Sequence, residues 1–152
     1  MWPIVSEPSE ARAGDQQAIV DVAVRYCWAL DERQYDDLRQ VFTPEATATL
    51  GGEDLVGVDA IIERVDRALT PLDASQHMVG THQVVVDGDR ATARCYLHAQ
   101  HVKRGTEGGD NFIFAGIYAD ELVRTSDGWR IAHRTLTGVW TEGNPAVTGR
   151  RR

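Results

Sequence analysis

The chain has 152 residues, of which 42% are hydrophobic, and its formal net charge at pH 7 is −7. This length and composition predict one soluble domain with a hydrophobic core of its own. The acidic balance and the absence of a basic stripe argue against a nucleic-acid-binding protein, and no apolar run is long enough to cross a membrane.

Residues 1–14 show neither a helical nor a strand period, and we expect them to form an N-terminal arm. They also lack the basic-then-apolar order of a signal peptide, so a cytoplasmic location is expected. From Asp15 to Glu32, apolar residues recur at steps of three and four, which predicts an amphipathic helix. The domain is expected to span residues 15–141, with a C-terminal tail at 142–152.

Two shorter helices are predicted at 35–42, where Thr43-Pro44 ends the pattern, and at 58–69. Period-two alternation and glycine turns then predict a short hairpin and four long strands. These strands span about 46–50, 53–56, 78–86, 90–103, 111–124 and 129–140. Helices first and strands last favour an α+β domain, with three N-terminal helices covering a strongly curved antiparallel sheet.

Tyr26 and Asp31 lie at the end of the first predicted helix, five positions apart and therefore about 140° around its axis. Both border its apolar face, so they can approach one cavity from two sides. A carboxylate there is costly unless it is paired or held neutral by burial. Asp31 is therefore either a site residue or simply the solvent-exposed end of the helix.

Several segments together resemble one known family. They are Tyr26 through Asp31, Gln76-His77-Met78-Val79-Gly80 and the turns at 87–91 and 127–131. Over about residues 15–141 the chain is similar to the SnoaL-like family of the ketosteroid-isomerase-like (nuclear-transport-factor-type) superfamily. This resemblance implies an α+β cone that encloses a pocket.

The Tyr-x-x-x-x-Asp helix end together with His77 resembles the site of scytalone dehydratase and bile acid 7α-dehydratase. The resemblance implies a cofactor-independent lyase or isomerase that acts beside a carbonyl of a small apolar or polycyclic substrate. His77 would be the base, supported by Asp31, and Tyr26 would donate a hydrogen bond to the carbonyl. In an alternative assignment Asp31 is the base and His77 the donor. His101, 24 residues after His77, would help to hold the leaving group.

Four further residues are candidates for substrate binding. Arg134 can anchor a carboxylate or phenolate, because a guanidinium binds such groups bidentately. On a regular strand, however, its position is opposite in parity to Trp129 and Ile131, which would turn it outward. The aromatic side chains among the candidates can line a pocket for a flat ligand; they are Trp28, Phe114 and Trp140.

A metal site is not expected, although the chain has five histidines. His77 and His82 differ by five positions and His98 and His101 by three, so both spacings split the pair across a strand. Two other functions stay open: a polyketide cyclase with the same acid–base set, and a non-catalytic binding or scaffold subunit. We also expect a homodimer or small homo-oligomer that pairs through the outer sheet face.

Overall fold

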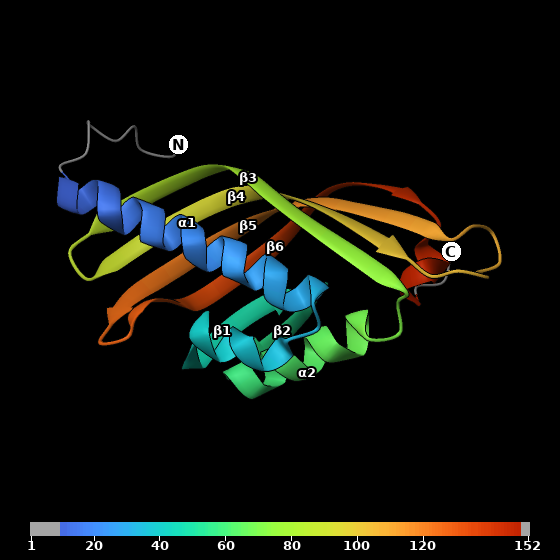
Figure 1. The fold of residues 1–152 in the computed structure, drawn as a ribbon, viewed down its shortest axis with the longest axis horizontal. Helices are drawn as coiled ribbons and strands as arrows, with labels where there is room; N and C mark the ends of the chain where they lie inside the picture. Colours follow the sequence, from blue (N-terminus) through green and yellow to red (C-terminus); the bar gives the residue numbers. More distant parts are fainter. Residues whose placement is uncertain (1–9, 150–152) are drawn as a thin grey trace.

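In a computed structural model, which describes residues 10–149, helices precede four long strands (Figure 1). The helices are α1 (Glu10–Asp31), α2 (Val58–Leu69) and the 3-10 segments η1 (Tyr35–Gln40) and η2 (Pro145–Thr148). The strands are β1 (Phe42–Leu50), β2 (Glu53–Val56), β3 (Ala74–Asp87), β4 (Arg90–Val102), β5 (Asn111–Thr125) and β6 (Gly128–Gly143). No helix within the described range is both long and apolar enough to cross a bilayer.

The six strands form one curved sheet in the order β2-β1-β6-β5-β4-β3. All neighbours are antiparallel except β1 and β6, which run parallel. α1 lies across the long strands and α2 packs beside the short β1–β2 hairpin (Figure 1). The α+β prediction is therefore confirmed, with a mostly antiparallel sheet rather than a wholly antiparallel one.

Several element ends differ from the prediction. α1 begins at Glu10, so part of the expected arm is helical, and residues 1–9 lie outside the described range. β1 begins at Phe42 and includes Pro44, whose fixed φ suits an extended edge. β6 runs on to Gly143, and the expected tail contains η2, where Val147 is buried. The basic residues 150–152 lie outside the described range.

A β-bulge in β6 changes which face Arg134 occupies. Ile131 pairs with Leu122 and His133 with Glu121, so Ala132 is an extra residue without a partner on β5. An extra residue reverses the alternation of the side chains that follow it. Arg134 therefore lies on the same inner face as Ile131, opposite to its position on a regular strand, and is fully buried.

The inner face of β4 follows the predicted alternation, with Ala91, Ala93, Cys95, Leu97 and Ala99 buried. Cys95 and Cys27 are free thiols within the core, and burial raises the pKa of Cys27 to about 12 and that of Cys95 to about 11. Both are therefore protonated at neutral pH and act as core side chains.

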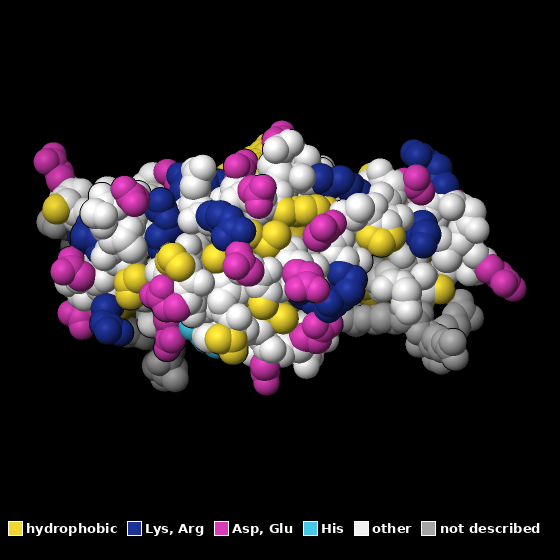
Figure 2. Space-filling model, turned by 90° about the horizontal axis from the view of Figure 1, so that it is seen from below, with side chains coloured by type: hydrophobic (Ala, Val, Ile, Leu, Met, Phe, Trp, Pro, Cys, Tyr) yellow, Lys and Arg dark blue, Asp and Glu magenta, His cyan; other side chains and the backbone are white. Residues whose placement is uncertain are grey.

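Parts of the surface carry apolar side chains. Met78, Tyr96, Val139 and Trp140 are each about half exposed. Figure 2, which shows the molecule from below, has acidic and basic side chains interspersed with small hydrophobic areas and no basic stripe on that face. The homo-oligomer stays a prediction, for which the exposed aromatic residues of β4 and β6 are the natural contacts.

Candidate active site

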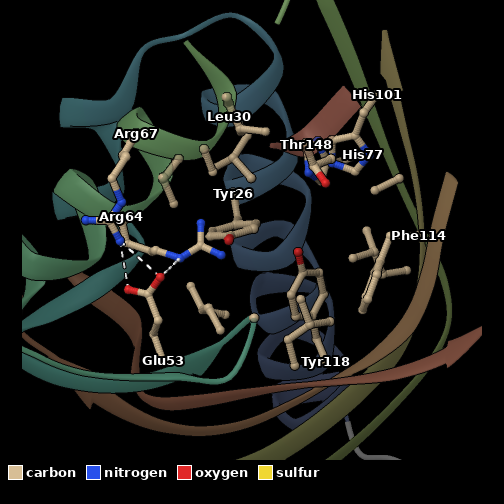
Figure 3. A pocket seen from close by; sticks show the side chains of 18 of the residues that line it. Tyr26, Leu30, Glu53, Arg64, Arg67, His77, His101, Phe114, Tyr118 and Thr148 are labelled. Atoms are coloured by element: carbon tan, nitrogen blue, oxygen red, sulfur yellow. Dashed lines mark hydrogen bonds and ion pairs between the residues drawn. The ribbon is translucent and has the colours of Figure 1, made fainter. Parts of the chain in front are cut away.

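A cavity of about 370 Å³ lies between α1, α2, the β1–β2 hairpin and the inner face of the sheet (Figure 3). Apolar side chains make up much of its wall, with polar groups at several places. The wall includes Tyr26, Leu30, Glu53, Arg64, Arg67, His77, His101, Phe112, Phe114 and Tyr118. In Figure 3 the two histidines lie on one side of this cavity and Arg64 with Glu53 on the other.

Asp31 and His77 form a close pair at the end of α1. The Nδ1 atom of His77 lies 2.6 Å from Oδ1 of Asp31, and the backbone N–H of His77 donates to Oδ2 at 2.7 Å. The hydroxyl of Ser75 also donates to Oδ1, at 3.1 Å. The carboxylate is thus held by three donors from β3, and the alternative that it merely ends the helix in solvent is wrong.

Arg33 connects the end of α1, which carries Asp31, to the segment that leads into β3, which carries His77. It lies just beyond α1 in the left-handed region (φ 57°), which ends the helix after Asp31. Its guanidinium donates to the carbonyls of Leu69 at 3.2 Å and Leu72 at 2.8 Å. The end of α1 is therefore tied to the segment between α2 and β3, which leads directly to His77.

The contact with Asp31 decides which nitrogen of His77 can act as a base. An ionised carboxylate only accepts hydrogen bonds, so Nδ1 carries the proton and the neutral ring has its lone pair on Nε2. Among the described residues Nε2 has no hydrogen-bond partner, and His77 is a wall residue of the cavity. This arrangement offers a base to a ligand in the cavity.

His101 lies beside this base on the neighbouring strand. The two imidazole centroids are 6.0 Å apart with the rings nearly perpendicular. The Nδ1 of His101 donates to the carbonyl of Phe112 at 3.3 Å. Burial, together with the nearby His77, lowers the pKa of His101 to about 4. His101 is therefore neutral at physiological pH and offers its Nε2 as an acceptor.

This lowered pKa predicts an acid-sensitive fold. Unfolded His101 takes up a proton near its ordinary pKa of 6.5, whereas the folded protein resists protonation down to about 4. Stability should therefore fall as the pH drops from about 6.5 to 4, by up to about 3 kcal/mol. Urea unfolding at pH 7 and pH 4.5 measures the difference, which should shrink in His101→Asn. A pH dependence that is the same in both proteins would contradict this assignment.

Tyr26 and Tyr118 carry the other polar groups of the inner wall, and their hydroxyls point into the cavity (Figure 3). Their rings stand edge to face, with centroids 5.5 Å apart. Burial raises the pKa of each phenol, while the charge of Arg134 opposes that shift in both. Both remain protonated at neutral pH, as a hydrogen-bond donor to a carbonyl must.

Arg134 does not line the cavity, and its prediction as a substrate anchor is wrong. The bulge at Ala132 turns it inward, where its guanidinium binds both oxygens of Asp120 at 2.7 and 2.8 Å. It lies against the rings of Tyr26 and Tyr118, 4.4 and 4.0 Å from their centroids. Burial alone would lower the pKa of Arg134, but the Asp120 carboxylate raises it, so the group stays charged. Its role is to pack over the rings of Tyr26 and Tyr118 and so to hold the two phenols in place.

Comparisons with known proteins identify the family of this chain. The family model described as a SnoaL-like domain matches residues 11–135. The uncharacterized protein Rv2910c of Mycobacterium tuberculosis is 35% identical over 134 residues, which cover 85% of this chain and 88% of that protein. The chain belongs to the SnoaL-like family.

Two further comparisons extend the family relationship. Terrestric acid biosynthesis cluster protein E of Penicillium crustosum is 32% identical over 142 residues, which cover 90% of each chain. The crystal structure of the Kfla4162 protein from Kribbella flavida superposes with a TM-score of 0.83 at 26% identity. That superposition covers 91% of this chain and 99% of the other. The SnoaL-like fold therefore extends over almost the whole chain.

Two aromatic residues predicted for the pocket of this SnoaL-like protein lie elsewhere. Trp28 is 61% exposed on the solvent side of α1. Trp140 is also exposed and packs on His98, with ring centroids 5.6 Å apart, on the outer face of the sheet. Phe114, by contrast, lines the cavity as predicted. Helix position and strand parity, rather than aromatic character, decide which of these side chains reach it.

The remaining histidines of the SnoaL-like domain do not join the site. His133 contacts Thr47 at 2.6 Å and Thr135 at 3.1 Å, and His98 packs on Trp140. Burial lowers the pKa of His82, which lies at the register shift of β3. Within residues 10–149, no three His, Cys, Asp or Glu side chains converge in a way that would hold a metal ion.

Sequence reasoning missed three parts of the site. Ser75 precedes His77 by two positions and so shares its face, which is a usable signal once His77 is chosen. Asp120 has no local signal in the sequence, although it pairs directly with Arg134 across β5 and β6. Arg64 adjoins the apolar stripe of α2, where a charge is usually solvated, so its sequence position does not indicate a site residue.

Proposed function

We propose that this SnoaL-like protein is a cofactor-independent lyase or isomerase, of the dehydratase kind, that removes a proton beside a carbonyl. The observation that carries the proposal is the 2.6 Å contact between Asp31 and Nδ1 of His77, which leaves Nε2 free at the cavity wall. A carboxylate in this position stabilises the imidazolium that forms when Nε2 accepts a proton.

The proposed reaction uses only the groups that line the cavity. His77 Nε2 takes the proton from the carbon next to the carbonyl, and the C–H electron pair forms an enolate. The hydroxyl of Tyr26, or of Tyr118 beside it, donates a hydrogen bond to the enolate oxygen. Protonated His77 then gives its proton to a β-hydroxyl, which leaves as water while the carbon–carbon double bond forms. His101, as a neutral group, can hold that hydroxyl.

The opposite assignment, with Asp31 as the base, has less support. Both carboxylate oxygens already accept hydrogen bonds, from Ser75 and from the ring and the backbone of His77. A small apolar or polycyclic carbonyl compound suits this cavity best as the substrate, because Phe112, Phe114 and Leu30 line it. The similarity to a Penicillium biosynthesis cluster protein also favours a small organic substrate.

Exchange of hydrogen for deuterium tests the first step without knowledge of the natural substrate. We expect the wild-type protein in D₂O to catalyse exchange at the carbon beside the carbonyl of planar ketones such as 2-tetralone and 1-indanone. NMR or mass spectrometry measures the rate against buffer and against His77→Ala. If such ketones bind but exchange no faster than in buffer, the scaffold alternative is the better one. A cyclase would catalyse the same exchange and is distinguished by ring-closed products.

A further inference from the structure

Two arginines of α2 meet one carboxylate at the end of the cavity that lies away from His77. Arg67 Nη2 contacts the two oxygens of Glu53 at 3.1 and 2.7 Å. Arg64 approaches the same carboxylate through Nε, at 3.1 Å from Oε1. Arg64 and Arg67 are one helical turn apart, and Glu53 comes from β2, so the hairpin and α2 hold the cluster between them.

Arg64 differs from its neighbours in burial and direction. Its side chain is 18% exposed, against 59% for Arg67 and 47% for Glu53. Figure 3 shows its guanidinium turned into the cavity toward Tyr26, with only Nε directed at Glu53. Within the described chain, its two terminal nitrogens have no protein hydrogen-bond partner. The donors of such a guanidinium must be satisfied from the cavity, by water or by a ligand that displaces it.

The local charge balance favours an anion. Histidines apart, the charged wall residues within the described range are Arg64, Arg67 and Glu53, so one positive charge is in excess. Arg67 occupies both oxygens of Glu53 and so weakens the repulsion that this carboxylate would exert on a ligand. Val65 and Leu69 of the same helix add apolar side chains to the cavity wall, which limits screening by water.

We propose that Arg64 binds an anionic group of the substrate, a carboxylate or phenolate, at the end of the cavity opposite His77. The planar guanidinium presents paired N–H donors that match the two oxygens of a carboxylate. The inference deepens the proposed function, on which it rests for the reacting end of the molecule. It assigns the substrate class as an elongated aromatic keto acid or ketophenol, with its acid on Arg64 and its carbonyl near Tyr26 and His77.

A matched pair of probes tests this assignment. 6-Acetyl-2-naphthoate carries a carboxylate and a methyl ketone at opposite ends, and 6-acetyl-2-naphthamide is its neutral counterpart. Isothermal titration calorimetry should show that wild type prefers the acid, and that Arg64→Met weakens acid binding by about 10- to 100-fold. Amide binding should change by less than about twofold. Arg64→Lys keeps the charge but lacks the planar guanidinium. Its affinity for the acid should lie between those of wild type and Arg64→Met.

Arg39→Gln is the matched control, because it removes one arginine from an exposed pair with Asp59, on residues that do not line the cavity. It should leave the ratio of acid to amide affinity unchanged, and circular dichroism should show every variant folded. An unchanged ratio in folded Arg64→Met would overturn the inference. Equal losses for both probes would do the same, because they would show a change of shape rather than of charge recognition.

The same probes separate this inference from the proposed function. Deuterium exchange into the acetyl group reports the chemistry, whereas the acid-to-amide affinity ratio reports Arg64. In His77→Ala, exchange should stop while the ratio stays as in wild type. Absence of exchange in wild type with an Arg64-dependent ratio would reject the proposed chemistry and keep the anion site.

Discussion

Asp31→Asn and His77→Ala are each expected to slow deuterium exchange into a bound ketone by about 10²- to 10⁴-fold, and the double variant should be little slower than either. His77 supplies the lone pair, and Asp31 fixes its tautomer through the 2.6 Å contact. Either change disables the same proton transfer, so the effects should not add. Single-turnover rates at saturating ketone measure them.

Two variants outside the cavity serve as controls, one of an acid and one of a histidine. Asp21→Asn changes an exposed acid of α1 that accepts a hydrogen bond from Gln17, and His98→Gln changes a histidine on the outer sheet face. Neither should alter the exchange rate. Additive losses for Asp31 and His77 would mean that the two residues act independently. A gain in stability for Asp31→Asn without loss of activity would mean that Asp31 has no part in the proton transfer, because its charge would then be only a burden.

Asp120→Ala is expected to reduce the free energy of unfolding by about 3–5 kcal/mol, because it leaves the Arg134 guanidinium charged and unpaired in the core. The pair is bidentate and neither side chain is more than 5% exposed. Removal of Asp120 also frees Arg134 to shift away from Tyr26 and Tyr118, so exchange activity should fall as well. Urea unfolding at pH 7 measures the first effect.

Asp59→Ala is the matched control for this ion pair. Asp59 binds Arg39 at a similar distance, 2.8 Å, but its side chain is 83% exposed. Its loss should cost no more than about 1 kcal/mol. The combined Asp120→Leu and Arg134→Met variant should recover much of the stability lost in Asp120→Ala, since no unpaired charge remains. If Asp120→Ala and Asp59→Ala reduced the free energy of unfolding equally, the buried pair would matter no more for stability than the exposed one.

The fold class could be predicted from the sequence, whereas local pattern predicted only part of the candidate site. Helical period placed Tyr26 and Asp31 on the border of one helix face, and strand parity placed His101 on the inner face of β4. His77 needed the family resemblance, because a lone histidine at a strand start is usually unremarkable. Its contact with Asp31 depends on the end of α1 meeting the start of β3, a long-range packing that local pattern does not encode.

The errors at Arg134 and the omission of Arg64 have physical causes. A single extra residue, Ala132, reverses strand parity, and nothing in its neighbours marks a bulge. Arg64 adjoins the apolar stripe of α2, where a charge normally reaches solvent, and only the Glu53 hairpin folding over it turns the guanidinium inward. Trp28 was predicted to line the pocket because it is aromatic, although its helix position faces solvent.

The protonation state of the His77 ring tests the central claim most directly, because the account requires a base at Nε2. Nitrogen-15 NMR of imidazole-labelled protein near neutral pH distinguishes a protonated ring nitrogen from one with a free lone pair. The account predicts a proton on Nδ1 and a lone pair on Nε2 in wild type, and loss of this preference in Asp31→Asn. A His77 ring with its proton on Nε2, unchanged by Asp31→Asn, would contradict it.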